Sequence, residues 1–289
     1  MTPCAVKCEV CELYPAMKSE PRQRVSAVLI TKDAAGQLAE CLASLAFCDE
    51  IVVVDTGSTD GTQALAAKLG ARVIESEWRG FGPQKQFAVA QAANDWVLCI
   101  DADERVSETL RQSILAVTRP RSGVPGTQSE PAPALCVPAG TLSAYRFARC
   151  NRFMGRYLRH GEGYPDWSLR FFDRRVAGWS DDAVHERVIA QGEVDTLAGD
   201  LLHDSAESLE NYLAKQNRYS TLAAEAALAR GKRANVIHLL MSPLMRFIKF
   251  YFLRLGLLDG VPGLVHILIC CTASFAKYAK MLAFQRSRP

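Results

Sequence analysis

The chain has 289 residues, of which 49% are hydrophobic, and its formal net charge is +3. This length and apolar content predict one large domain with a substantial core, plus an appendage. The charge is uneven: residues 231–289 hold nine Lys or Arg and one acid, which gives +8 there and −5 for the rest. Because this basic tail is rich in Phe, Leu, Ile and Tyr, it favours an anionic membrane surface over nucleic acid as a partner.

Residues 1–23 are expected to be an N-terminal extension. The first 20 residues carry acids and lack an apolar core, so no secretory signal peptide is predicted and the ten cysteines are expected to be cytosolic thiols. Cys4, Cys8 and Cys11 have a C-x3-C-x2-C spacing that some enzymes use to hold an iron–sulfur cluster. The alternative, which we favour, is an adventitious or disordered extension.

Apolar runs and helical patterns alternate over the first hundred residues. Strands are predicted at 25–30, 50–55, 71–76 and 95–101, with helical patterns over 38–45, 62–69 and 83–93 between them. Such alternation builds right-handed βαβ units. The predicted fold class is therefore α/β, with a mostly parallel sheet covered by helices on both faces.

The second half of the chain is less regular. Ser107 is expected to cap a helix ending near Val117, and the proline- and glycine-rich segment 119–140 to be a flexible insertion. Strands resume at 144. Further strands are predicted at 167–172, 184–190 and 193–197, a helix over 208–230, and two apolar helices over 234–284 broken at "LLDGVPG". The expected organisation is a domain over 24–230 and a basic amphipathic helical region over 231–289.

The stretch "LCIDADERV" places Asp101 and Asp103 at the end of an apolar run, and Asp55 ends an earlier strand. Ligands of doubly wound sheets bind beyond the carboxyl ends of the strands, so these acids are expected to face one crevice. An Asp-x-Asp pair supplies hard oxygen ligands that suit Mg²⁺ or Mn²⁺, completed by water and substrate phosphates. The alternative is that Asp103 and Glu104 only cap the following helix.

Two further motifs precede this pair. "VVVDTGSTDGT" places a glycine-rich turn after a strand, and "GFGPQKQFA" places Lys85 in a glycine-flanked loop at a helix start, where it can neutralise a phosphate. The order of these motifs and D-A-D closely resembles family 2 glycosyltransferases of the GT-A (Rossmann-like) fold, over about residues 24–260. The resemblance implies an inverting enzyme that uses a nucleotide-diphosphate sugar.

The resemblance also implies roles for individual residues. Thr31 and Asp55 match nucleoside contacts, Lys85 a contact to the base or diphosphate, and Asp101 with Asp103 the metal and sugar–ribose motif. The family often has an Asn-Glu pair after the first strand. This chain has Asp33-Ala34 there, so no contact is assigned to it.

Four later segments resemble one subfamily of these enzymes in particular. They are "YPDWSLRFFDR", "DDAVHERV", "LLHDSAESLENYLAKQNRYS" and "RFIKFYFLRLGLLDG". Together they resemble bacterial lipopolysaccharide or lipooligosaccharide core β-1,4-glucosyltransferases. This implies UDP-glucose as donor, a lipid-linked or lipopolysaccharide-core acceptor, and a cytoplasmic enzyme at the inner face of the bacterial inner membrane.

An inverting transfer needs a base for the acceptor hydroxyl. Asp166 is the first candidate, because D-W-S-L-R resembles the family's acidic segment on the acceptor side. Asp182 and Glu186 are the alternatives. Asp166 also follows Pro165, and a plain turn residue there remains open.

Three other side chains carry expected roles. His185 is a candidate metal ligand or diphosphate contact, and Arg170 a candidate phosphate contact. His203, at a strand end, is expected to be a structural hydrogen-bonding histidine more than a ligand.

The C-terminal helices raise the question of membrane binding. The longest uncharged run, Gly260 to Ala276, has 17 residues, whereas a bilayer span takes about 20. A peripheral amphipathic anchor or a self-association surface in a homo-oligomer is therefore favoured over a span. An ordinary helical cap on the domain is the remaining alternative.

Two other classes remain open at this point. A nucleotidyltransferase also uses acidic metal ligands, but it usually has a glycine-rich basic loop after the first strand, where this chain has "ITKDAAGQLAE". A non-catalytic sugar-nucleotide binding module is the second rival. The presence of Asp101, Asp103 and Asp166 argues against that module.

Overall fold

The computed structural model describes residues 22–119, 142–182, 186–205 and 208–287. The predicted extension with Cys4, Cys8 and Cys11, and all but the first residue of the predicted insertion 119–140, lie outside the described residues.

The first four strands form a parallel half-sheet in the order β3-β2-β1-β4. They are β1 (Val25–Thr31), β2 (Glu50–Asp55), β3 (Arg72–Glu75) and β4 (Trp96–Cys99). Side chains of β1, β2 and β4 are buried on both faces, which explains their continuous apolar sequences. All four predicted strands are confirmed.

Helices cover both faces of this half-sheet, as predicted. α1 (Ala35–Ser44), α2 (Thr62–Lys68) and α4 (Glu108–Val117) contribute to one apolar cluster, and α3 (Phe81–Ala90) to the cluster on the opposite face. The Ser107 hydroxyl accepts a hydrogen bond from the Leu110 amide at 3.3 Å, so the predicted N-cap is also confirmed.

Beyond β4 the sheet is mixed rather than mostly parallel. It continues through β8 (Asp166–Asp173), β6 (Leu142–Phe153), β11 (Glu193–His203) and β5 (Glu104–Val106). The pairs β4–β8, β6–β8 and β11–β5 are antiparallel, and β6–β11 is parallel. Because β5 follows Asp103 directly and pairs with the end of β11, it brings His203 beside the Asp-x-Asp segment.

Three short strands lie at the margins. β7 (Arg156–Tyr157) pairs with β6, and β9 (Ala177–Trp179) pairs with β10 (Val188–Ala190). Of the predicted strand 184–190, residues 186 and 187 are not part of β10, and residues 184 and 185 lie outside the described residues. β11 runs six residues beyond the predicted end at 197.

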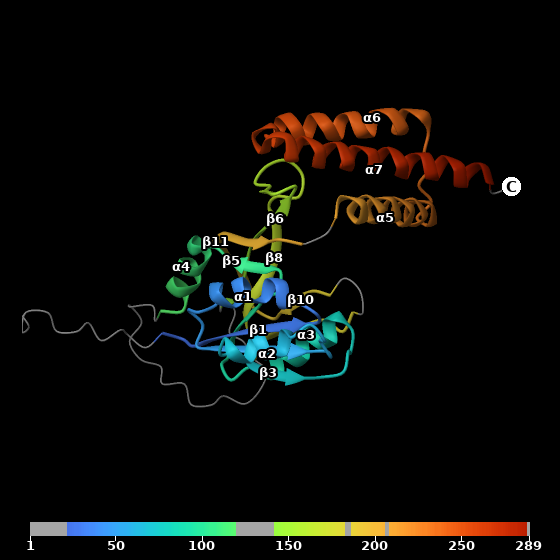
Figure 1. The fold of residues 1–289 in the computed structure, drawn as a ribbon. Helices are drawn as coiled ribbons and strands as arrows, with labels where there is room; N and C mark the ends of the chain where they lie inside the picture. The colour runs from blue at the N-terminus through green and yellow to red at the C-terminus, as the bar shows by residue number, and fades with distance from the viewer. Residues whose placement is uncertain (1–21, 120–141, 183–185, 206–207, 288–289) are drawn as a thin grey trace, which may run out of the picture.

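The C-terminal helices form a separate layer, drawn in orange and red in Figure 1. α5 (Leu209–Ala229) and α6 (Val236–Phe247) both pack against α7 (Gly260–Ser287), and a π-helical turn (Ile248–Leu253) and a 3-10 turn (Gly256–Asp259) link α6 to α7. α5, which we placed with the sheet from its sequence, therefore lies with the C-terminal helices.

Within the described part of the chain, two helical segments are apolar and long enough to cross a membrane. They are Val236–Leu253, of 18 residues, and Gly256–Arg286, of 31 residues. No residue of the first segment is buried in the protein, and a third of the tested window of the second is buried. The sequence pointed only to the second.

The loop that follows β7 anchors the helical layer to the sheet. The Asp259 carboxylate is buried and accepts hydrogen bonds from the backbone amides of Arg159 at 3.0 Å and His160 at 2.8 Å. Arg246 of α6 forms an ion pair with Glu162 of the same loop. The helices are thus fixed to the loop by buried and half-buried polar contacts, and their apolar outer surface is left exposed.

Candidate functional site

Two cavities meet at the carboxyl ends of the parallel strands. The first, of about 730 Å³, lies over β1, α3 and β4, and we call it the strand-end cavity. The second, of about 800 Å³, lies between the sheet and α5, and we call it the helix-side cavity. Asp103, Arg149 and His203 line both, so a group held at these residues is reachable from either side.

The floor of the strand-end cavity begins at the ends of β1 and β2. Thr31 lines the cavity and donates a hydrogen bond to Asp55 at 2.8 Å. Asp55 is 0% exposed, and its carboxylate also accepts from the Ser58 amide at 2.8 Å and the Gln63 side chain at 2.7 Å. Burial opposes ionisation of Asp55, but these hydrogen bonds outweigh it and lower its pKa. In this arrangement Asp55 supports the turn, whereas Thr31 faces the cavity.

The turn after β2 depends on glycine. Gly57 and Gly61 have φ angles of 83° and 88°, a region that other residues rarely adopt. This requirement accounts for two glycines of the D-x-G-S-T-D-G motif.

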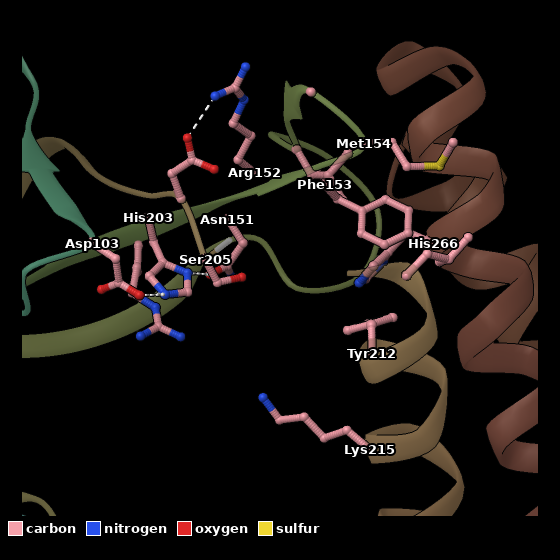
Figure 2. A pocket seen from close by; sticks show the side chains of 15 residues that line it. Asp103, Asn151, Arg152, Phe153, Met154, His203, Ser205, Tyr212, Lys215 and His266 are labelled. Atoms are coloured by element: carbon pink, nitrogen blue, oxygen red, sulfur yellow. Dashed lines mark hydrogen bonds and ion pairs between the residues drawn. The ribbon is translucent and has the colours of Figure 1, made fainter. Parts of the chain in front are cut away.

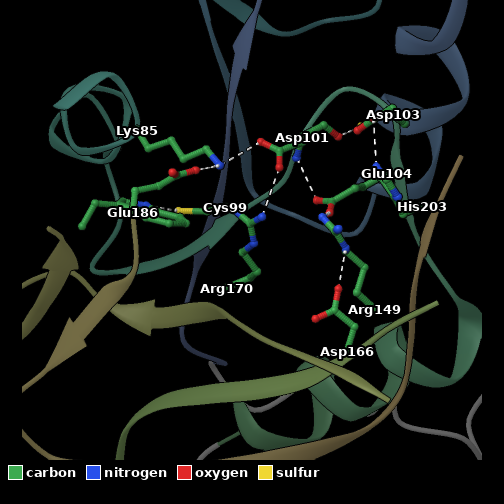
Figure 3. Close-up of polar contacts among 12 residues, drawn as sticks. Lys85, Cys99, Asp101, Asp103, Glu104, Arg149, Asp166, Arg170, Glu186 and His203 are labelled. Atoms are coloured by element: carbon green, nitrogen blue, oxygen red, sulfur yellow. Dashed lines mark hydrogen bonds and ion pairs between the residues drawn. The ribbon is translucent and has the colours of Figure 1, made fainter. Parts of the chain in front are cut away.

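Asp101 is held between two cations at the centre of the site (Figure 3). Its carboxylate oxygens lie 3.3 Å from the Lys85 ammonium and 3.1 Å from the Arg170 guanidinium. Burial would raise the pKa of Asp101, but the charges of Arg170 and Lys85 outweigh it and lower the pKa to about 2. Both oxygens are therefore engaged by cations, and a metal bound by Asp101 would share an oxygen with Lys85 or Arg170.

Lys85 and Arg170 are themselves largely buried, at 7% and 8% exposed. Lys85 also lies 3.2 Å from the Glu186 carboxylate, and both cations lie over the ring of Trp179. One guanidinium nitrogen of Arg170 is buried and has no hydrogen-bond partner among the described residues. A buried cation with an unused donor is suited to bind an anionic ligand.

Asp103 faces His203 rather than Lys85 or Arg170. The His203 Nε2 atom lies 3.2 Å from the Asp103 carboxylate, and the Nδ1 atom lies 2.7 Å from the Asn151 side-chain oxygen. His203 thus has the structural hydrogen bond that we expected, and in addition it faces the second aspartate of the D-A-D motif. The capping alternative for Asp103 and Glu104 is not found: Ser107 caps the helix, and Glu104 lies in β5.

Arg149 connects the remaining acids. It lies 3.5 Å from Glu104, which is 0% exposed, and 3.2 Å from Asp166. Burial, followed by the charge of Asp101, raises the pKa of Glu104. Asp166 lies across from Arg149 on the neighbouring strand β8 and borders neither cavity. Asp166 is therefore connected to the cavities through Arg149, which lines both of them.

The segment "DDAVHERV" is only partly described. Glu186 lines the strand-end cavity, whereas Asp182 is exposed and outside both cavities. His185 lies outside the described residues. Of the residues predicted for the site, the structure therefore gathers Thr31, Lys85, Asp101, Asp103, Arg170 and Glu186 around one cavity.

Several lining residues were not predicted. Arg149 and Asn151 come from β6, whose sequence shows only alternation. Trp78 and Phe81 line the strand-end cavity with their rings edge to face at 4.9 Å, and each is about half exposed. The sequence marks these two as aromatic but does not distinguish an exposed aromatic residue from a core one.

The side chains at the site can be compared with the ligands that a divalent metal ion needs. Among the described residues, no group of three or more His, Cys, Asp or Glu side chains is arranged to enclose an ion. Asp103 and His203 supply one oxygen and one nitrogen donor beside a cavity with Lys85 and Arg170. Mg²⁺ and Mn²⁺ sites on phosphate-bearing substrates need few protein ligands, because water and phosphate oxygens complete the shell. The residues present fit such a shared site.

Comparisons with known proteins find similarity to glycosyltransferases. The family model described as "Glycosyl transferase family 2" matches residues 26–127. The lipopolysaccharide core biosynthesis glycosyltransferase LpsC of Rhizobium meliloti (strain 1021) is 32% identical over 268 residues, covering 90% of this chain and 93% of that protein. An uncharacterized glycosyltransferase of Rickettsia felis is 29% identical over 270 residues, covering 90% of this chain and 89% of that protein.

Solved structures are more distant. The mannosyltransferase PcManGT from Pyrobaculum calidifontis, in complex with GDP-Man and Mn²⁺, superposes with a TM-score of 0.46 at 17% identity and covers 96% of this chain and 80% of that chain.

Proposed function

The chain belongs to glycosyl transferase family 2 and is a glycosyltransferase, and from that premise we propose that it transfers a hexose from a UDP-sugar to a lipid-linked saccharide of the lipopolysaccharide core. The observation that carries the proposal is the pairing of Asp103 with His203 beside Asp101, Lys85 and Arg170, at one end of a cavity open to the strand ends.

The strand-end cavity is proposed to bind the donor. The nucleoside lies at Thr31 and the exposed rings of Trp78 and Phe81, and the diphosphate lies toward Lys85 and Arg170. These two buried cations stabilise the negative charge that the diphosphate gains as it leaves. Asp55 acts through the turn that it supports.

Asp103 and His203 are proposed to hold Mg²⁺ or Mn²⁺, with Asp101 beside them and His185 as a further candidate. Bound there, the ion supplies Lewis-acid stabilisation of the departing diphosphate. The chain's own contribution is to fix the donor atoms: Asn151 holds the His203 ring so that Nε2 faces Asp103.

The transfer is proposed to invert the anomeric centre in one displacement. The acceptor oxygen forms the new bond to the anomeric carbon as the bond to the diphosphate oxygen breaks, and the hydroxyl proton passes to a carboxylate. Asp166 remains our first candidate for that base because of its motif, although it is paired with Arg149 and borders neither cavity. Glu186 and Asp182 remain the alternatives.

The identity of the substrates rests on similarity. UDP-glucose is proposed as the donor from the resemblance of residues 164–260 to core β-1,4-glucosyltransferases. A lipopolysaccharide-core acceptor is proposed because LpsC, named for that pathway, is similar over nearly its whole length.

The helical layer is proposed to bind the cytoplasmic face of the inner membrane peripherally. α6 has no buried residue, and most of its large apolar side chains are exposed, as are many in the following turns. The exposed ones are Val236, Ile237, Leu240, Met241, Leu244, Met245, Ile248, Phe252, Leu253, Leu255, Leu257 and Leu258. Lys249 and Arg254 lie among them and provide charge complementary to anionic lipid. Self-association through this surface is the competing role.

A donor screen tests the proposed chemistry. The purified protein is incubated with UDP-, GDP- and dTDP-sugars and Mn²⁺, and release of the nucleotide diphosphate is measured with and without lipopolysaccharide-core acceptors. We expect UDP-glucose to be the best donor and the acceptor to accelerate release. Turnover of another donor class at a higher rate would overturn the assignment of UDP-glucose.

A further inference from the structure

The helix-side cavity has two chemically different ends. At one end lie Asp103 and His203, which the strand-end cavity shares. At the other end lie side chains of α5 and α7, among them Tyr212, Lys215 and His266. Figure 2 shows these two groups facing one another across the cavity. A ligand that fills this space would touch the catalytic residues and the helical layer at the same time.

Three aromatic rings form the wall at the helical end. The centroid of Phe153 lies 5.4 Å from that of Tyr212 and 5.4 Å from that of His266, and Tyr212 lies 6.0 Å from His266. They come from β6, α5 and α7, so the wall exists only when the helical layer is docked on the sheet. Aromatic walls with a few polar groups are typical of small-ligand cavities, and the apolar C–H face of a sugar ring packs on such a wall.

β6 links the wall to the reactive end. Asn151 and Phe153 are two residues apart on this strand, so their side chains leave the same face about 7 Å apart. Asn151 holds His203, and Phe153 begins the aromatic wall. The polar side chains Arg152, Ser205 and Lys215 also line the cavity. One sugar unit at the aromatic wall would therefore place its neighbour at Asp103 and His203.

Two exposed apolar side chains border this cavity. Met154, which is 55% exposed, and Leu209, which is 44% exposed, both line it. The exposed apolar surface of α6 belongs to the same helical layer.

We propose that the helix-side cavity is the acceptor site, which binds a lipid-linked saccharide with its reacting sugar at Asp103 and His203 and its next sugar against Phe153, Tyr212 and His266. This inference rests on the proposed function. It makes the helical layer a wall of the active site, so that these helices act on acceptor binding even when no membrane is present.

The test uses the full-length protein and a soluble probe, deacylated lipopolysaccharide-core oligosaccharides. Their binding is measured by calorimetry in the presence of UDP and Mn²⁺, and UDP binding is measured separately. Tyr212→Ala removes one ring of the wall, and Tyr212→Phe keeps the ring. Tyr219→Ala is the matched control, because Tyr219 lies on the same helix, is 51% exposed and lines neither cavity.

We expect Tyr212→Ala to weaken oligosaccharide binding about 10-fold, which corresponds to about 1.4 kcal/mol. Tyr212→Phe and Tyr219→Ala are expected to bind within about 3-fold of the unmodified protein. UDP binding should be retained in all three variants. Phe153→Leu, on the sheet side of the wall, should reproduce the loss and serves if Tyr212→Ala fails to fold.

The proposal is overturned if Tyr212→Ala or Phe153→Leu binds the oligosaccharides as tightly as the unmodified protein, or if Tyr219→Ala loses binding equally. It is also overturned if the unmodified protein binds UDP but no oligosaccharide. Failure of the unmodified protein to bind UDP with Mn²⁺ would instead contradict the proposed donor site. The two failures are therefore distinguishable.

Discussion

The parallel half-sheet and α6 contain similar apolar residues in opposite surroundings. Leu29 of β1 is 1% exposed, whereas Leu240 of α6 is 61% exposed. The strands are covered by helices on both faces, whereas among the described elements α6 packs mainly against α7. Apolar composition alone therefore does not say whether a segment stabilises the fold or meets a partner. We propose that the sheet carries the chemistry and that the exposed helices bind lipid or another chain.

The largest expected effect separates chemistry from fold in the sheet region. Asp103→Ala removes the carboxylate that faces His203, and we expect the transfer rate to fall about 1,000-fold or more while the melting temperature stays the same. Glu193→Ala, an exposed acid at the start of β11, is the control. A variant at Asp103 that keeps near-normal turnover with saturating Mn²⁺ would remove this residue from the site.

A second experiment sharpens the contrast in burial. Leu29→Ala should destabilise the protein by about 2–5 kcal/mol, because it opens a cavity in the core. Leu240→Ala should change the free energy of unfolding by less than about 0.5 kcal/mol, because its side chain packs on little. Urea denaturation measures both. If Leu240→Ala were as costly as Leu29→Ala, α6 would be a structural cap or an oligomer interface.

The assignment of the base is tested by a smaller effect. Asp166→Asn keeps the shape of the side chain but cannot accept the proton, so kcat should fall about 100-fold while the affinity for UDP changes little. Asp182→Asn and Glu186→Gln are measured in parallel. Should one of these two show the loss in kcat and Asp166→Asn not show it, the base belongs to residues 181–188.

The smallest expected effect concerns the charge of the helical layer. Lys249 is exposed beside the apolar surface, and Lys249→Gln should weaken binding to anionic vesicles about 5-fold, for a loss of about 1 kcal/mol. The difference should vanish in high salt and on neutral vesicles. Sedimentation with vesicles measures it. Equal binding of the unmodified protein to neutral and anionic vesicles would contradict electrostatic attachment.

The sequence predicted the parts of the fold that depend on local pattern. Continuous apolar runs identified β1 to β4, and Ser107 identified the start of α4, because burial on both faces and helix capping leave short-range signals. The partnership of Asp103 and His203 was not predicted, since it depends on β5 pairing with a strand about 100 residues later. β11 was predicted too short because a register shift between Thr196 and Asp200 interrupts its alternation.

The sequence also left open whether α6 is exposed, because a membrane anchor and a structural cap were both possible. An apolar helix that packs in a core and one that faces outward have the same residues, and only the neighbours differ. Asp166 was predicted for the site from its motif, but its dependence on Arg149 follows from the pairing of β6 with β8.

The central claim is that the sheet region uses a divalent ion at Asp103 and His203 to transfer a sugar. Its most direct test is release of UDP from UDP-glucose by the purified protein in EDTA, followed by addition of Mn²⁺, Mg²⁺ or Zn²⁺. The account predicts that EDTA abolishes release, that Mn²⁺ or Mg²⁺ restores it in the unmodified protein, and that neither ion restores it in Asp103→Ala. Release that persists in EDTA, or that only Zn²⁺ restores, would contradict it.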